Sequence, residues 1–299
     1  MEFIAEFCQN HNGDFNILAD MVYSAKDHGA SYAKVQHIYS DMLSFREKFE
    51  PGMTNIGAKK TLIRPYKNEY ERLKKLELSM REQLDFINLC NKVGIKPLTT
   101  IFSTNSLSEI LELGYKDIKI ASYDCGSENL INSVIGNFDK IIISTGATYD
   151  DEIEKTSLQL KNSNFTFLHC VTLYPTPLQE YHLNRMNYLR KFTNFVGWSD
   201  HSLVEKDGIK GTLASIFYGA DVVERHFTIL PSEQTKDGPV SIKPEHLNEI
   251  VEFAKLDKEE QEKHLNDIFP EYSICLGLQQ RKLTQNELAN RDYYKGRFI

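Results

Sequence analysis

The chain has 299 residues, of which 41% are hydrophobic and 26% charged. This is ample apolar material for a folded core, in one large domain or in two ordinary ones. The net charge is −7 and charges of both signs are interspersed, so no nucleic-acid surface is predicted, and an anionic ligand must be met by locally placed cations.

The amino-terminal segment and the cysteines indicate the compartment. The start, MEFIAEFCQN, lacks the basic-then-apolar order of a signal peptide, and no run of about 18 apolar residues is present. The odd number of cysteines favours buried free thiols in a reducing compartment over disulfides or a thiolate zinc site. These are Cys8, Cys90, Cys125, Cys170 and Cys275. We therefore expect a cytoplasmic protein that does not enter a membrane.

Short apolar runs of β type alternate with amphipathic helical patterns along most of the chain. The runs are 3–7, 32–36, 96–100, 117–122, 140–145, 165–170, 195–200 and 222–227. Eight strands that alternate with helices predict an α/β fold whose parallel sheet closes into a (β/α)8 TIM barrel. An open doubly wound sheet is the structural rival.

The helices between these runs include 15–29 and 247–256, and capping-box pairs predict two helix starts, Ser79 with Glu82 and Ser106 with Glu109. Two segments break the rhythm. Residues 37–64 form a long irregular segment, interpreted as a lid or binding loop, with a passive surface excursion as the alternative. Residues 257–299 form a polar extension that either packs on the barrel or reaches a partner subunit.

Polar and charged residues collect where the predicted strands end, which is the end of a TIM barrel that carries its active site. They are Glu6, Lys34, Gln36, Thr99, Thr100, Lys119, Ser122, Ser144, Thr145, His169, Ser199, Asp200, His201, Glu224 and His226. Inward-pointing lysines are costly unless they are paired or used. A satisfied structural hydrogen bond is the alternative for any single member.

His201 and His226 end two neighbouring strands, which lie about 4.8 Å apart in a parallel sheet. Both imidazoles can therefore bind one metal ion and leave open positions for Lewis-acid catalysis. Glu224 and Asp200 are candidates for a third ligand or for orienting the histidines. The alternative is that these histidines, and His169, bond to core backbone.

Cations at the same end indicate an anionic substrate. Lys34 and Lys119 are accompanied by hydroxyl groups suited to a phosphate and a carboxylate. The hydroxyls belong to Thr100, Ser122, Ser144 and Ser199. The turn 144–146 (STG) is also a candidate for donating backbone N–H groups to phosphate, although Ser144 fits an ordinary helix cap equally well.

Seven motifs, in this order, resemble the sialic acid synthase family of N-acetylneuraminate, legionaminate and pseudaminate synthases. They are IAEFCQNHNGD, AKVQ, KIAS, ISTGA, LHCVTLYPTP, VGWSDHS and VVERHFT, and the resemblance spans residues 1 to about 255. It implies a TIM barrel that condenses phosphoenolpyruvate with an acylated amino-hexose and releases phosphate. It also implies a divalent ion held by two histidines, with Mn2+ expected and Mg2+ or Co2+ as alternatives.

Carried over by motif, the resemblance assigns roles to individual residues. The implied metal ligands are His201 and His226. Phosphoenolpyruvate is bound by Lys34, Thr100, Lys119, Ser122, Ser144 and Ser199. The reaction centre is lined by Glu6, Gln36, Asp124, Tyr174 and Glu224 as catalytic candidates, and Asp237 is assigned to substrate binding.

Members of that family usually carry a carboxyl-terminal antifreeze-like domain, which in the dimer supplies an arginine to the partner's sugar site. Here we expect a barrel over 1–256 and a short extension over 257–299 instead of a separate antifreeze-like domain. A homodimer is an open alternative to a monomer. Departures from the family pattern at Ile101, Tyr123, Thr172 and Asp237 all concern the sugar side.

The leading hypothesis is therefore a metal-dependent synthase that makes a nonulosonic sugar acid from phosphoenolpyruvate and an aldose. Two alternatives are the same reaction with a non-acylated aldose, and a non-catalytic barrel subunit that binds phosphoenolpyruvate.

Overall fold

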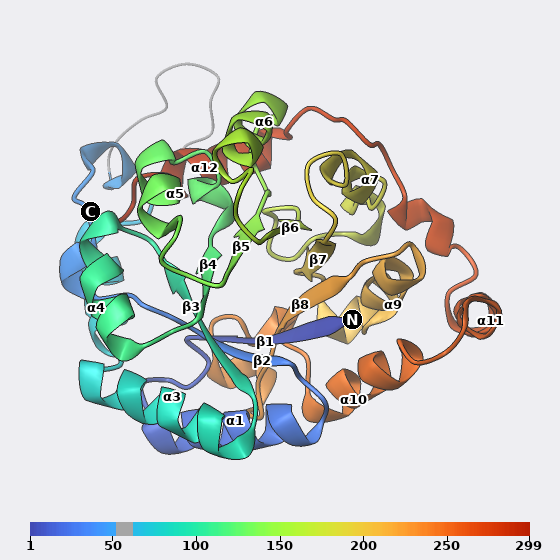
Figure 1. The fold of residues 1–299 in the computed structure, drawn as a ribbon, viewed down its shortest axis with the longest axis horizontal. Helices are drawn as coiled ribbons and strands as arrows, with labels where there is room; N and C mark the ends of the chain where they lie inside the picture. The colour runs from blue at the N-terminus through green and yellow to red at the C-terminus, as the bar shows by residue number, and fades with distance from the viewer. Residues whose placement is uncertain (52–61) are drawn as a thin grey trace.

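A computed structural model describes residues 1–51 and 62–299, in which eight parallel strands close into a barrel surrounded by helices (Figure 1). Each strand pairs with the next one in sequence, and β8 pairs with β1. The strands are β1 (Glu2–Cys8), β2 (Tyr32–Gln36), β3 (Lys96–Ile101), β4 (Asp117–Ile120), β5 (Lys140–Ser144), β6 (Phe165–His169), β7 (Val196–Asp200) and β8 (Val222–His226). The prediction of a TIM barrel is confirmed, and the open sheet is wrong.

The helices follow the strands in the order expected of βα units. They are α1 (Phe15–Asp27), α2 (Tyr66–Lys74), α3 (Met80–Val93), α4 (Leu107–Leu113), α5 (Glu128–Val134), α6 (Asp150–Gln159), α7 (Arg185–Leu189), α8 (Val204–Asp207), α9 (Lys210–Phe217), α10 (Pro244–Phe253), α11 (Lys258–Ile268) and α12 (Gln285–Tyr294). Helix α10 begins earlier than its apolar pattern because a proline at the first helical position needs no hydrogen-bond acceptor. Within the described ranges, no helix is long and apolar enough to cross a membrane.

One of the two predicted capping boxes is present. Ser79 and Glu82 bond reciprocally at the start of α3, as predicted. The box at Ser106 is wrong, because a 3-10 turn capped by Ser103 precedes α4 and Ser106 already has helical backbone angles. Glu109 instead lies 3.1 Å from a ring nitrogen of His37.

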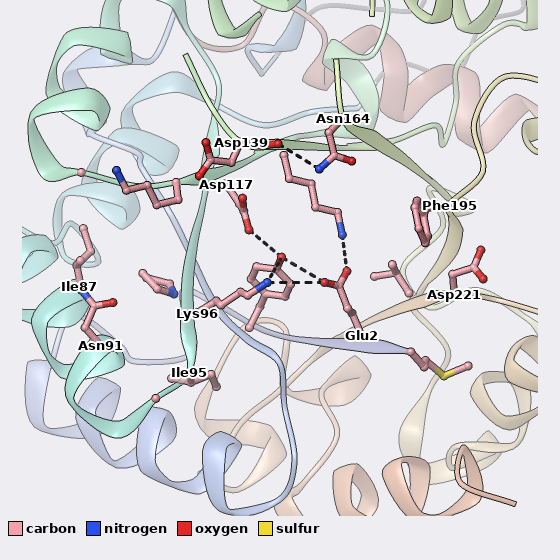
Figure 2. A pocket seen from close by; sticks show the side chains of 18 of the residues that line it. Glu2, Ile87, Asn91, Ile95, Lys96, Asp117, Asp139, Asn164, Phe195 and Asp221 are labelled. Carbon is pink, nitrogen blue, oxygen red and sulfur yellow. Dashed lines mark hydrogen bonds and ion pairs between the residues drawn. The ribbon is translucent and has the colours of Figure 1, made fainter. Parts of the chain in front are cut away.

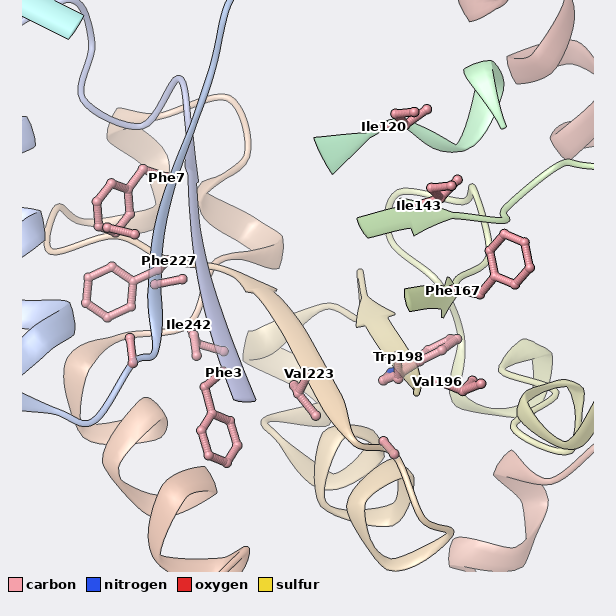
Figure 3. Close-up of a cluster of buried hydrophobic side chains, with 14 of the residues drawn as sticks. Phe3, Phe7, Ile120, Ile143, Phe167, Val196, Trp198, Val223, Phe227 and Ile242 are labelled. Atoms are coloured by element: carbon pink, nitrogen blue, oxygen red, sulfur yellow. The ribbon is translucent and has the colours of Figure 1, made fainter. Parts of the chain in front are cut away.

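The two faces of the barrel wall have different tasks. Side chains that point outward, such as Phe3, Val223 and Trp198, form the large apolar core between sheet and helices (Figure 3). Inward-pointing side chains from six strands form a separate apolar layer, made of Ile4, Tyr32, Leu98, Ile142, Leu168 and Val222. Because strand side chains alternate, the next inward positions toward the carboxyl ends form a second layer, and that layer is polar.

The segment after β2 contacts the carboxyl-terminal extension. Phe49 packs edge-on against Tyr293 with ring centroids 4.9 Å apart, and Leu43 forms a β-bridge with Phe298. The chain end accordingly lies beside this segment in Figure 1. The predicted lid over 37–64 includes residues 52–61, which lie outside the described residues, so the lid stays a prediction.

Candidate active site

The polar layer opens into a cavity of about 420 Å³ at the carboxyl ends of the strands. Every residue to which the family resemblance assigned a catalytic, substrate-binding or metal-binding role lines this cavity. They are Glu6, Lys34, Gln36, Thr100, Lys119, Ser122, Asp124, Ser144, Tyr174, Ser199, His201, Glu224, His226 and Asp237. The structure thus brings the candidates together, and their individual roles remain proposals.

The floor of the cavity is a buried group of two lysines and two carboxylates. Lys119 Nζ lies 2.8 and 2.9 Å from the two carboxylate oxygens of Glu224, and Ser199 donates to the same carboxylate at 2.8 Å. Lys34 contacts Glu6, its register partner across β1 and β2, and lies 3.6 Å from Glu224. Glu6 and Lys34 come from neighbouring strands, whereas Glu224 of β8 reaches across the barrel interior to Lys119 of β4. Pairing of opposite charges is how a barrel interior can hold four ionisable groups.

Burial and neighbouring charges shift the pKa values of two of these groups, Lys34 and Glu224. Burial lowers the pKa of Lys34 to about 7, Lys119 acts in the same direction, and Glu224 opposes the shift. Burial disfavours the charged form of Glu224, but Lys119 and Lys34 outweigh it and hold the pKa of Glu224 well below its usual range. Glu224 is consequently ionised at neutral pH, whereas Lys34 can exchange a proton there.

Two histidines stand beside this floor. The rings of His201 and His226 have centroids 5.5 Å apart, and the Tyr174 hydroxyl lies 3.2 Å from Nε2 of His201. Burial lowers the pKa of both, to about 3 for His201, so that both rings are neutral at neutral pH. Each ring has a buried Nδ1 that finds no hydrogen-bond partner in the described part of the chain. Two neutral imidazoles with unused nitrogens fit a divalent transition metal.

The other proposed metal ligands have different partners. Asp200 bonds Arg225 at 2.6 Å and the hydroxyls of Tyr181 and Thr212, outside the cavity. Glu224 is held by the floor lysines. Asp200 thus points away from the cavity that holds the two histidines, which does not fit a ligand role, whereas Glu224 as a third ligand stays a prediction. Cys8 and Asp237 also offer ligand atoms beside His226.

Three further candidates serve the scaffold. His169 is fully buried and hydrogen-bonds the carbonyl of Tyr181 at 2.7 Å, so the structural alternative applies to it. The Thr99 and Thr145 hydroxyls donate to main-chain carbonyls.

In the STG turn, Gly146 N–H donates to Ser122 Oγ at 3.2 Å, and a Cβ there would stand 2.5 Å from Cys170 Sγ. The turn is thus built for close packing.

Residues from the carboxyl-terminal extension complete the wall, and sequence reasoning missed them. Asn290, Tyr294, Arg297 and Phe298 line the cavity. Tyr294 stacks on Tyr123 with centroids 4.9 Å apart, and Asn290 donates to the Thr172 carbonyl at 2.7 Å. The aromatic and basic composition of DYYKGRF was the only hint, because these contacts join distant parts of the chain.

A larger cavity of about 1050 Å³ lies at the opposite end of the barrel, near the amino ends of the strands (Figure 2). Several of its polar side chains bond to one another: Lys140 contacts Glu2, and the Tyr32 hydroxyl donates to Asp117 at 2.8 Å. That end of a TIM barrel contributes stability, whereas catalysis belongs to the other. We therefore place the site at the carboxyl ends.

Fold and site together define a TIM-barrel enzyme with a buried floor of paired lysines and carboxylates and with two neighbouring histidines suited to binding a metal ion. Comparison with known proteins agrees with this class. The NeuB family model matches residues 21–263, and the chain belongs to the NeuB family. The expected relationship to sialic acid synthases is thereby confirmed.

Relatives show the same enzyme class. The chain is 33% identical over 251 residues to the N,N'-diacetyllegionaminic acid synthase of Campylobacter jejuni, covering 82% of this chain and 72% of that one. The enzyme of the same name from Legionella pneumophila is 31% identical over 298 residues, covering 96% and 76%. The crystal structure of N-acetylneuraminic acid synthetase from Leptospira borgpetersenii superposes with a TM-score of 0.72 at 26% identity, covering 97% and 90%. The prediction of a sugar acid synthase is confirmed.

Proposed function

We propose that the protein condenses phosphoenolpyruvate with an acylated amino-hexose to give a nonulosonic acid and phosphate. One observation carries the proposal: Lys34 and Lys119 meet at Glu224 on the cavity floor, directly beside the His201 and His226 pair. The first pair suits a small multiply charged anion, and the second suits a carbonyl-polarising ion. The names of the relatives support the product class.

Phosphoenolpyruvate would bind over the lysines. Ser144 Oγ is buried and unpartnered among the described residues, so it is free to donate to a phosphate or carboxylate oxygen. Thr100, Ser122 and Ser199 line the same floor. Charge-assisted bonds of this kind are about twice as strong as neutral ones and are strongest where water is excluded.

His201 and His226 would hold the divalent ion, with Mn2+ the expected species. When bound, the ion supplies Lewis-acid polarisation of the sugar's open-chain aldehyde. Tyr174 packs over His201 with ring centroids 4.3 Å apart. It would therefore orient the His201 ring and form one wall of the space in which the aldehyde binds.

The chain's own residues handle charge and protons. The methylene carbon of phosphoenolpyruvate forms a bond to the aldehyde carbon, whose oxygen takes up a proton. Water adds at the neighbouring enol carbon, which has developed positive character, and the carbon–oxygen bond to phosphate then breaks and leaves a ketone. Glu6 and Glu224 stabilise the positive character, and both are candidates for moving protons. Gln36 and Asp124 line the same space.

The test is phosphate release. The protein is incubated with Mn2+, phosphoenolpyruvate and a panel of acylated and non-acylated aldoses. Release that depends on one acylated amino-hexose and is lost in His226→Ala supports the proposal. Release with a non-acylated aldose alone would assign an atypical acceptor. Phosphoenolpyruvate binding without release from any sugar would favour a non-catalytic subunit and would overturn the synthase.

A further inference from the structure

The potential metal ligands extend beyond the two histidines. A sulfur, a ring nitrogen and a carboxylate oxygen, from Cys8, His226 and Asp237, all lie within 4.8 Å of one another. Small side-chain rotations bring three such atoms to the usual ligand distances of about 2.0–2.3 Å around one ion. We propose that Cys8 and Asp237 are further ligands of the ion held by His201 and His226, so that a thiolate and a carboxylate supplement the two imidazoles. The inference rests on the proposed function in that a divalent ion occupies this pocket.

The backbone at Cys8 is arranged to aim its side chain. Cys8 ends β1 with φ at +48°, a left-handed conformation that costs a residue with a side chain about 1–2 kcal/mol. The register of β1 against β2 shifts between Glu6 and Cys8, and the Cys8 N–H donates to Glu6 Oε1 at 2.6 Å. Such irregularities commonly re-aim a side chain beside an active site. Here the kink brings the thiol to the loop that follows β8.

That loop holds Asp237 firmly. The Asp237 carbonyl accepts from Ser241 Oγ at 2.7 Å, and the same hydroxyl accepts from Asn10 Nδ2 at 2.9 Å. Gly238 follows Asp237 at a point where a Cβ would stand 1.8 Å from the Ser232 carbonyl oxygen. The segments carrying Cys8 and Asp237 are therefore tied together by the protein itself, which keeps both ligands near His226.

Two thiols line the cavity, those of Cys8 and Cys170, and their surroundings distinguish them as candidate ligands. His226 is only 8% exposed, and its Nδ1 bonds to none of the residues 1–51 and 62–299. An unpaired buried nitrogen is costly unless a ligand satisfies it. The Cys8 thiol has the Asp237 carboxylate as its neighbour beside His226, whereas Cys170 Sγ lies 3.0 Å from Ser122 Oγ. Cys170 is thus the matched control for Cys8.

A sulfur ligand changes which ions the pocket prefers. Thiolate and imidazole suit softer transition metals, whereas Mg2+ prefers oxygen ligands and retains its water. We expect Co2+ and Zn2+ to bind more tightly than Mg2+. Of the alternatives suggested by the sequence, Mg2+ becomes the poorest fit.

The experiment is a titration of the metal-free full chain with Co2+, followed by absorption spectroscopy and equilibrium dialysis. Wild type should develop a near-ultraviolet sulfur-to-cobalt charge-transfer band. Cys8→Ser should lose the band and bind Co2+ about tenfold or more weakly, whereas Cys170→Ser keeps the band. Asp237→Asn should keep the band with weakened affinity. Circular dichroism checks that each variant is folded.

The outcomes separate this inference from the proposed function. A wild-type complex without the band, a band that persists in Cys8→Ser, or a failure to bind Co2+ overturns the ligand assignment. Phosphate release with Mn2+ but no band in Co2+ overturns the assignment alone. If the band depends on Cys8 but no aldose gives phosphate release, the assignment of Cys8 as a ligand is supported and the proposed reaction is overturned.

Discussion

At the scale of single residues, the properties of the site depend on ion pairs that are buried away from water. Glu224 is the common partner of both floor lysines and accepts from Ser199 as well. Lys34 has Glu6 as a second partner, whereas the salt bridge of Lys119 is made with Glu224. Removing a buried partner is more costly than removing an exposed one, because the remaining charge stays out of water.

Glu224→Gln should therefore destabilise the fold by about 3 kcal/mol or more and should abolish phosphate release. Urea unfolding measures the first effect. The control is Glu252→Gln, whose carboxylate pairs with Lys255 while both side chains are more than half exposed, so its cost should stay below about 1 kcal/mol. Equal losses in the two variants would show that the buried floor is not a coupled charge group.

Asp124 should make stability depend on pH. Burial raises the pKa of its carboxyl to about 7, against smaller opposing effects of Ser127 and Lys295. The folded state then holds the proton more tightly than the unfolded chain, so this contribution is present below about pH 4 and is lost as the pH rises through 7. Asp124→Asn removes the titration. The stability of wild type relative to the variant should fall over this window by at most about 1.4 kcal/mol per pKa unit, less for the exposed part of the carboxyl.

Unfolding curves recorded for both proteins at several pH values check this. A constant difference between pH 4 and 8 would contradict a raised pKa for Asp124.

At the scale of elements, helix starts depend on local hydrogen bonds that similar sequences do not always make. Ser79 caps α3 through the Glu82 N–H, whereas Ser106 makes no cap bond at α4. Ser79→Ala should lower the free energy of unfolding by about 1 kcal/mol. Ser106→Ala should lower it by less than this, because the buried Ser106 hydroxyl makes no cap bond and only a 3.8 Å contact with the Met42 sulfur. Chemical denaturation compares the two, and a larger loss at Ser106 would reverse the assignment of caps.

At the scale of the whole molecule, the carboxyl-terminal extension is part of the site wall. Arg291 of α12 donates to the Ala147 carbonyl at 2.6 Å and to Glu152 at 2.5 Å. These bonds dock α12 against the β5–α6 connection, and the same helix presents Tyr294 and Asn290 to the cavity. The extension thus contacts Tyr123 and Thr172, two positions at which the sequence departs from the family pattern. A cytoplasmic location and a homodimer stay predictions.

Arg291→Ala should loosen this helix, at a cost of about 1–3 kcal/mol for the lost charged hydrogen bonds. The KM for the aldose should rise several-fold while the KM for phosphoenolpyruvate changes little, because the lysine floor lies on other elements. Steady-state kinetics with each substrate varied in turn measures this. Lys48→Ala is the control, since it removes an exposed ion pair to Asp292 on the same helix. An equal rise in both KM values would place α12 outside the sugar side.

Sequence and structure agree most closely where the signal is local. All eight strands lie where the apolar runs predicted them, because alternation of side chains along a strand is a short-range pattern. The candidate residues also meet in one cavity, because parallel strands bring their carboxyl ends to the same rim. The same alternation accounts for Asp200, which lies between the inward-facing Ser199 and His201 and points outward to Arg225.

The sequence by itself determined the barrel, the end that carries the chemistry, and the group of lysines, hydroxyls and histidines found there. Only the tertiary structure decided which neighbours those groups have. It paired Glu224 with the lysines, turned Asp200 toward Arg225, brought Cys8 and Asp237 beside His226, and packed Tyr294 on Tyr123. The reason is physical. Strand periodicity is encoded in adjacent residues, whereas a contact between β1 and the β8 loop, or between α12 and the rim, depends on how distant segments pack.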